Sequence, residues 1–270
     1  MKAMRASMAT LLLAACASTT PIAEKEPDPG LAEFIMQNTR ALGGAAALDG
    51  VQTMVKQSLI EEGDYRDVAV FATDRNGRMR VDLFADGERV FAESYNGQSG
   101  FQWRPDEGQS PASQRGTIAL SHTPQLPNHI FRLKDMAQNG HRLELLQPEQ
   151  REGRAFQVLR LTLSDGFETY LLLEESSGLV TRSRNRRALH VDINDQQKVI
   201  ESRVSDFRRV GDIVHPHRVE EVDLKTGETL VRVTVHSVRL NVPLSAEYFD
   251  NLVSEVPQPH PVDQPPPDPD

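Results

Sequence analysis

The sequence predicts a mainly β (α+β) fold: an open, curled antiparallel β-sheet of about eleven strands, forming an unclosed barrel capped by a few helices. Three observations predict it. Apolar residues recur at helical spacing near the start and then with a period of two after residue 50. Short turn sequences such as DRNG, YNGQ and KTGE separate the alternating segments, as in hairpins. Helical patterns return only between residues 106 and 140, and so wide a sheet must curl around its few helices.

The first element is a helix that begins at Asp28-Pro29, an N-cap residue followed by proline at the first helical position. The pair Gly43-Gly44 breaks or bends it before the segment AAALDG. Its apolar stripe must lie on another part of the chain, and the strands that follow supply the partner. The stripe consists of Leu31, Phe34, Ile35 and Leu42.

The strands are predicted from alternation, because side chains two residues apart lie on one face. The segments GTIALSH and LPNHIFRLKDMAQNG interrupt the alternation, and we expect both to form helices that cover the concave face. Apolar residues that share a strand face are Val81 and Leu83, then Leu171 and Leu173, then Val231, Val233 and Val235.

The N-terminal segment is typical of an export signal. Lys2 and Arg5 provide a basic region, residues 6–13 are apolar, and small residues precede Cys16, the only cysteine. Residues 1–15 are therefore predicted to be a signal peptide, 16–28 a tether, 29–252 the β-domain and 253–270 a proline-rich disordered tail. The alternative is an ordinary secretory signal that contains a cysteine by chance.

The sequence Leu13-Ala14-Ala15-Cys16 resembles the lipobox of bacterial lipoproteins. The resemblance implies cleavage before Cys16, a diacylglyceryl thioether on its sulfur and acylation of the new N-terminus. Several acyl chains anchor a protein stably in a bilayer. Ala17 stands where an inner-membrane retention signal would usually have aspartate, so the expected location is the outer membrane, on its periplasmic face.

The net charge of −9 argues against a nucleic-acid partner, because proteins that bind nucleic acids carry basic surfaces that neutralise phosphates. No segment after the signal contains the 18 or more apolar residues that a membrane-spanning helix needs. With no cysteine besides Cys16, the domain must fold without internal disulfides.

Four segments resemble the LolA/LolB-like superfamily of periplasmic lipoprotein carriers and receptors. They occur in the family's order over most of residues 30–250: ALGGAAALDGVQTM, YNGQSGFQW, SDFRRVGDIVHPHRVE and LNVPLSAEYFD. The resemblance implies an unclosed barrel whose apolar interior holds acyl chains. Carriers of this kind are free in the periplasm, whereas the receptors are outer-membrane lipoproteins, so Cys16 places this chain on the receptor-like side.

A curled sheet of this width encloses space that a ligand or the helices must fill. If the apolar rows face inward they line an acyl-chain groove; otherwise they pack beneath the cap helices. The candidate lipid-binding residues are Val81, Leu83, Leu171, Leu173, Val231, Val233 and Val235.

Patterns that suggest catalysis or metal binding have simpler interpretations. Ser99 is in GQSGF, which lacks the last glycine of a nucleophile elbow, so we interpret it as a turn residue. His215 and His217 project to one side of a strand but lack an assured third ligand, which favours a surface strand over a zinc site. We expect no catalytic site, metal or cofactor.

A row of arginines also has two interpretations. It could bind anionic headgroups, or it could form an outer face paired with glutamates such as Glu201, and the second is favoured. The row consists of Arg182, Arg184 and Arg186.

These observations predict a non-enzymatic lipoprotein, anchored in the outer membrane through lipidated Cys16, that binds acyl chains of a lipoprotein or lipid and acts in their sorting. The alternative is an envelope sensor or scaffold with the same fold that binds a protein partner.

Overall fold

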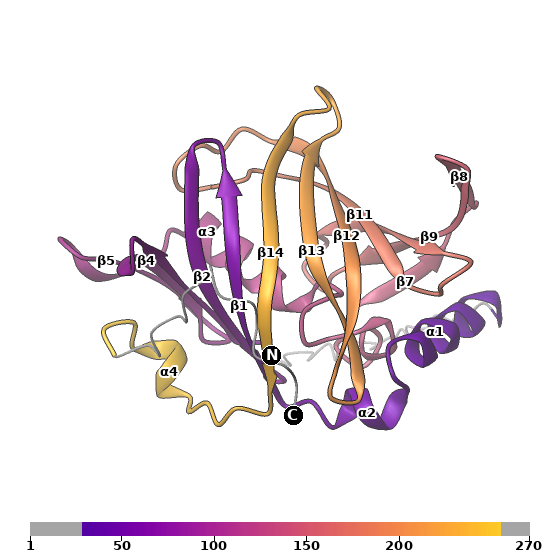
Figure 1. Cartoon of the computed structure of the whole chain (residues 1–270), viewed down its shortest axis with the longest axis horizontal. Helices are drawn as coiled ribbons and strands as arrows, with labels where there is room; N and C mark the ends of the chain where they lie inside the picture. The colour runs from indigo at the N-terminus through magenta and orange to yellow at the C-terminus, as the bar shows by residue number, and fades with distance from the viewer. Residues whose placement is uncertain (1–28, 255–270) are drawn as a thin grey trace, which may run out of the picture.

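The computed structural model describes residues 29–254, which form a curled antiparallel sheet with short helices packed against it (Figure 1). The predicted signal peptide, the tether with Cys16 and residues 255–270 of the tail lie outside the described residues. No helix within residues 29–254 is long and apolar enough to cross a bilayer.

The helices are α1 (Pro29–Ala41), α2 (Ala45–Asp49), α3 (Gln114–His122) and α4 (Glu247–Asp250), with 3-10 turns η1 (Thr123–Gln125) and η2 (Leu133–Asp135). The first seven strands are β1 (Thr53–Glu62), β2 (Tyr65–Asp74), β3 (Met79–Ala85), β4 (Glu88–Tyr95), β5 (Gly100–Arg104), β6 (Gly108–Pro111) and β7 (Arg142–Leu145). The others are β8 (Glu149–Arg151), β9 (Arg154–Thr162), β10 (Glu168–Glu174), β11 (Val180–Arg187), β12 (Lys198–Val210), β13 (Ile213–Asp223) and β14 (Thr229–Leu240).

The sheet has the order β6-β5-β4-β3-β2-β1-β14-β13-β12-β11-β10-β9-β7, with β8 paired to β9. The first and last strands therefore pair in its centre, while β6 and β7 remain as edges, and the sheet does not close into a barrel. This confirms the predicted fold. Within residues 29–254 the sheet has 14 strands rather than about eleven. The short strands β6, β7 and β8 have only four, four and three residues, too few to show alternation.

The stripe of α1 packs onto the sheet as predicted. Leu31 and Leu42 belong to one core cluster with Leu133 of η2 and with Leu171 and Leu173 of β10. α1 ends against the turn between β12 and β13, where the Val214 amide donates to the Leu42 carbonyl at 3.0 Å. This contact fixes the C-terminal end of the helix to the start of β13, which is far away in the sequence.

Replacing Gly43 with alanine is expected to lower the free energy of unfolding by more than about 2 kcal/mol. Gly43 has a φ of 117°, and a Cβ there would lie 2.2 Å from the Asp212 carbonyl oxygen. Gly44 is the matched control, because its φ is 93° but a Cβ added to it would have no atom within 4 Å. Gly44→Ala should cost about 1 kcal/mol from backbone strain alone. Urea denaturation measures both, and equal losses would show that the contact with Asp212 does not matter.

The prediction of helices between residues 106 and 140 is correct only for its first half. GTIALSH forms most of α3, whose N-cap Ser113 accepts a hydrogen bond from the Gly116 amide at 2.9 Å. The second segment is mostly turns around η2. There the Arg132 amide donates to the Asp135 carboxylate at 2.8 Å, which ends the chain's extended course and starts a single tight turn. A continuous helix over this segment is interrupted by the positive φ of Asn128, 76°, and of Gly140, 77°.

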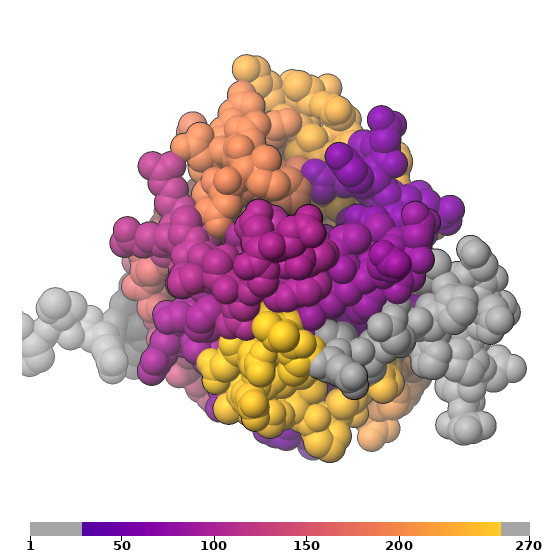
Figure 2. All heavy atoms as spheres, turned by 90° about the vertical axis from the view of Figure 1, so that its left-hand side faces the viewer, coloured from indigo at the N-terminus to yellow at the C-terminus, as the bar shows by residue number. Residues whose placement is uncertain are grey.

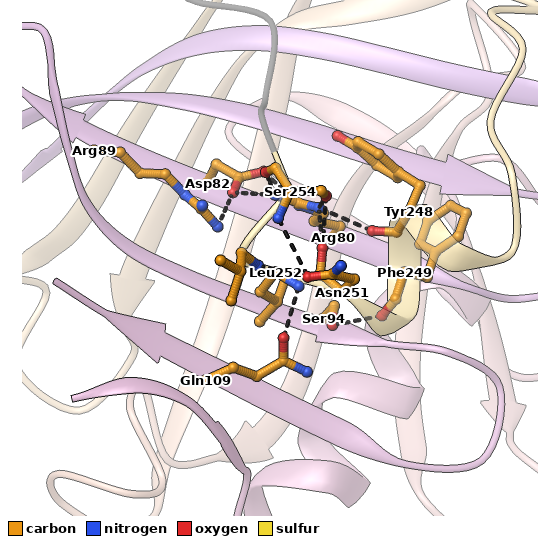
Figure 3. Close-up of polar contacts among 11 residues, drawn as sticks. Arg80, Asp82, Arg89, Ser94, Gln109, Tyr248, Phe249, Asn251, Leu252 and Ser254 are labelled. Atoms are coloured by element: carbon orange, nitrogen blue, oxygen red, sulfur yellow. Dashed lines mark hydrogen bonds and ion pairs between the residues drawn. The ribbon is translucent and has the colours of Figure 1, made fainter.

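The C-terminal clasp, residues 241–254, covers the convex face of the wing formed by β3 to β6 (Figures 2 and 3). Arg80 and Asp82 of β3 are fully buried beneath it. The Arg80 guanidinium donates to the carbonyls of Tyr248 and Asn251 at 2.9 and 3.1 Å. Ser94 donates to the Phe249 carbonyl at 2.8 Å. The clasp therefore satisfies polar groups that a sheet surface would otherwise present to water.

Candidate functional site

The strand register places all seven candidate lipid-binding residues on one face of the sheet. Residues paired across antiparallel strands point to the same side. One row runs Leu83–Ala69–Ser58–Val235. A second runs Val231–Glu221–Ser202–Ser183–Leu171. The other three residues follow by alternation: Val81, Leu173 and Val233.

This shared face is the concave one that the helices cover. Leu171 and Leu173 are almost completely buried there, in the core beneath α1 and η2. Val81 and Leu83, on the opposite wing, keep part of their surface accessible, as do Val231 and Val233 on the central strand. Thus α1 and η2 cover the β9–β10 side of the concave face and α3 packs against β4 and β5, whereas Val81 and Leu83 of β3 keep some accessible surface.

Strand β3 has an unusual burial pattern, because its charged side chains are more buried than the apolar side chains that alternate with them. The charged residues Arg80 and Asp82 are 0% exposed on the convex face beneath the clasp. The apolar residues Val81 and Leu83 alternate with them and are only partly buried on the concave face. Apolar area left accessible on an inward wall is where a hydrophobic ligand would gain most from binding.

The loop between β11 and β12, residues 188–197, reaches strands β1 and β5 on the other side of the sheet (Figure 1). Gln102 of β5 donates to the Asp192 carboxylate at 2.9 Å. His190 lies 2.8 Å from the Glu62 carboxylate on β1. We name this loop the bridging loop. These contacts join the β11–β12 side of the sheet to strands β1 and β5 on the other side.

Two ionisable groups are enclosed on the same wall. Lys56 of β1 and Glu93 of β4 lie in one row with Phe71 and Val81 between them. Burial lowers the pKa of the Lys56 ammonium to about 7, with a further contribution from Arg132. Burial raises the pKa of the Glu93 carboxyl to about 7, although nearby His190 opposes the shift. Both residues nevertheless retain some accessible surface on this inward face of the sheet.

The histidine pair is not on a surface strand, so that interpretation is wrong. His215 and His217 are 1% and 6% exposed on the inward face of β13, with ring centroids 5.8 Å apart. Each Nδ1 is engaged by a backbone carbonyl, of Pro216 and His215 respectively. No group of three or more potential metal ligands occurs among residues 29–254. The two histidines point inward because they share a face of β13 with Ile213, which belongs to the main core.

Two arginines of the row are paired with glutamates, as the favoured interpretation expects, but Arg182 and Glu201 are buried rather than at a solvated face. Arg182 lies 3.2 Å from Glu201 and 2.6 Å from Glu152. Arg184 lies 2.7 Å from Glu149. Ser99 is exposed in the turn between β4 and β5, where its amide donates to the Asn96 side chain, as expected of a turn residue.

A polar pocket of about 390 Å³ opens where α3 meets the turns after β2 and β9. Within its lining, His122 is 2.6 Å from the Asp165 carboxylate and stacks on Phe167 with ring centroids 4.3 Å apart. Charged groups that already have partners do not suit an acyl chain. None of the seven candidate lipid-binding residues lines this pocket.

Sequence reasoning missed Lys56, Phe71 and Glu93. Alternation assigns Phe71 to the inward face once the register is known, but a lone lysine or glutamate within a strand carries no sign of enclosure. Only the pairing of β1 to β4 brings the three into one row.

Solved structures reveal the fold family. A LolA superfamily protein from Nitrosomonas europaea is 17% identical, with a TM-score of 0.52, over 81% of this chain and 96% of the other. The fold is LolA-like. A DUF1329 family protein from Desulfovibrio piger has a TM-score of 0.53 at 14% identity, over 81% of this chain and 96% of its own. No family model and no curated protein matches the sequence. The LolA-like fold agrees with the four motif segments, which lie in α1–β1, β4–β5, β12–β13 and the clasp.

Proposed function

We propose that this LolA-like protein is an outer-membrane-anchored periplasmic lipoprotein that binds acyl chains on the concave face of its sheet. The acyl chains would belong to a lipoprotein or a lipid, and binding would serve their sorting. The anchor in this proposal is lipidated Cys16, which the sequence pattern supports.

The inverted burial of β3 is the observation that carries the proposal. Val81 and Leu83 keep accessible surface, while Arg80 and Asp82, which alternate with them, are fully buried. Burial of apolar surface contributes about 25 cal/mol per Å². The free energy that an acyl chain gains by burial on this wall nearly offsets the free energy that it loses on leaving a membrane. Transfer between the two requires that the two free energies nearly balance.

Native mass spectrometry of the full-length protein purified from cell envelopes tests the proposal. We expect copurified species with the masses of acylated molecules. The protein-partner alternative makes the opposite prediction, a lipid-free protein that retains a bound polypeptide. Recovery of the lipid-free form alone, also after incubation with phospholipid vesicles, would contradict acyl-chain binding.

Val233→Glu is expected to reduce bound lipid at least tenfold, because it places a carboxylate on the inward wall. Val199→Glu is the matched control, since Val199 is 46% exposed and pairs with Arg186 on the outer face of the sheet. Circular dichroism and thermal denaturation confirm that both variants fold. Equal lipid retention by the two would remove Val233 from the binding wall.

A further inference from the structure

Lys56 is an enclosed cation without a counterion. Its Nζ lies 4.6 Å from the centre of the Phe71 ring, and it forms no hydrogen bond or ion pair with any of residues 29–254. A lone ammonium in an apolar setting is costly for a fold to keep. The cation–π contact with Phe71 offsets only a small part of that cost.

Three further nitrogen groups surround the same position. His129 packs on Phe71 with ring centroids 5.2 Å apart. Lys56 and Arg132 both lower the pKa of the His129 and His215 imidazoles, adding to the larger effect of burial, so the four groups lie within electrostatic reach of one another. Three of their nitrogen atoms are buried without a hydrogen-bond partner within the described chain: His129 Nδ1, His215 Nε2 and Arg132 Nε.

The acidic groups of the neighbourhood are engaged elsewhere. Asp135, which faces Arg132, lies 3.2 Å from Arg75 and 3.0 Å from Lys134. Glu93 shares the row of Lys56, but Phe71 and Val81 lie between them. On the other side of His215, His217 adds a further imidazole, and Asp206 interacts with Arg208 at 2.6 Å. The cluster is thus cationic and largely buried, and Lys56 keeps some accessible surface on the concave face.

We propose that the Lys56 cluster binds the oxyanion headgroup of an amphiphile whose acyl chain lies along the concave wall, such as a fatty-acid carboxylate. A carboxylate or phosphate supplies the negative charge and the acceptors that Lys56, His129 and His215 lack. Apolar side chains continue from the cluster along the wall: Phe71, Val81, Leu83, Ile60 and Val233. This inference rests on the proposed acyl-chain binding and adds to it a headgroup class.

Isothermal titration calorimetry of the full-length protein with palmitate and with hexadecanol separates headgroup from chain. We expect palmitate to bind at least tenfold more tightly than the neutral alcohol. Lys56→Met should abolish that preference, because palmitate binding weakens at least tenfold relative to hexadecanol binding. The exposed Lys225→Met is the matched control and should preserve the preference.

Proton uptake provides a second readout. An anion beside Lys56 raises the pKa of the ammonium again, so at pH 8 binding should take up a proton. The observed enthalpy should then depend on the ionisation enthalpy of the buffer in the wild type and not in Lys56→Met. A structural role for Lys56 alone would not produce this difference.

The outcomes that overturn the inference are distinct from failure of the proposed function. Equal affinity of the wild type for palmitate and hexadecanol would contradict the anion site and still support acyl-chain binding. Binding of neither compound removes acyl-chain binding itself. Inorganic phosphate that binds alone, with the same dependence on Lys56, identifies a site for a small anion and overturns the lipid headgroup.

Discussion

Replacing Arg80 with methionine is expected to lower the free energy of unfolding by about 3–5 kcal/mol, the usual cost of breaking a buried ion pair. The guanidinium forms two hydrogen bonds with the Asp82 carboxylate, at 2.8 and 3.0 Å, and both side chains are fully buried. Methionine fills much of the volume but leaves the Tyr248 and Asn251 carbonyls without their donor. Within residues 29–254, Asp82 then keeps only the ion pair with Arg89, at 2.6 Å.

Arg104→Met is the matched control on the same wing. Arg104 is 38% exposed on its side chain, and its partner Glu107 lies 3.6 Å away at the surface. Such pairs contribute about 0–1 kcal/mol. Urea denaturation of both variants measures the difference. A loss below about 1 kcal/mol for Arg80→Met would mean that the clasp adds no more than a surface contact does.

Replacing Lys56 with methionine is expected to stabilise the protein, by up to about 5 kcal/mol at pH 6. The pKa of the ammonium falls from 10.5 to about 7 on folding, chiefly through burial, so the folded state disfavours the charged form. Methionine has a similar length, packs on Phe71 and carries no charge. A chain that retains so costly a cation gains something from it other than stability, and the proposed headgroup site supplies the reason.

The advantage of Lys56→Met should shrink as the pH rises. Below pH 7 Lys56 is protonated in both states, and the full cost of burying its charge is present. Between pH 7 and 10.5 the unfolded chain binds one proton more than the folded protein, so wild-type stability rises by about 1.4 kcal/mol per pH unit from this group. Denaturation curves of both proteins at pH 6, 8 and 9 measure the gap. A gap that does not change with pH would show that Lys56 is not enclosed as a cation.

The local elements were predictable where sequence patterns are long. Pro29 and the pair Gly43-Gly44 delimit α1 because they act through backbone geometry alone. Alternation identified the long strands, whereas β6, β7 and β8 were too short to show it. The segment after α3 has helical spacing, but Asn128 and Gly140 adopt positive φ values of 76° and 77°, which limit it to short turns.

The surroundings of the candidate site were less predictable, because burial depends on distant segments. In β3 the residues Val81 and Leu83 look like the buried face and Arg80 and Asp82 like the solvent face. The clasp reverses this, since it arrives from the far end of the chain and covers the charged side. Alternation alone likewise leaves His215 at a surface, and only the register shows its inward direction.

The pairing of β1 with β14 also constrains how the molecule acquires its shape. Ile60 pairs with Val233, so a chain emerging N-terminus first presents β1 long before its neighbour exists. Until then β1 is an unpaired edge, which invites pairing with other molecules. Contacts between residues so far apart in the chain slow folding to the millisecond-to-second range. Completion of the sheet thus waits for its last strand, and the unpaired β1 edge is open to aggregation during that interval.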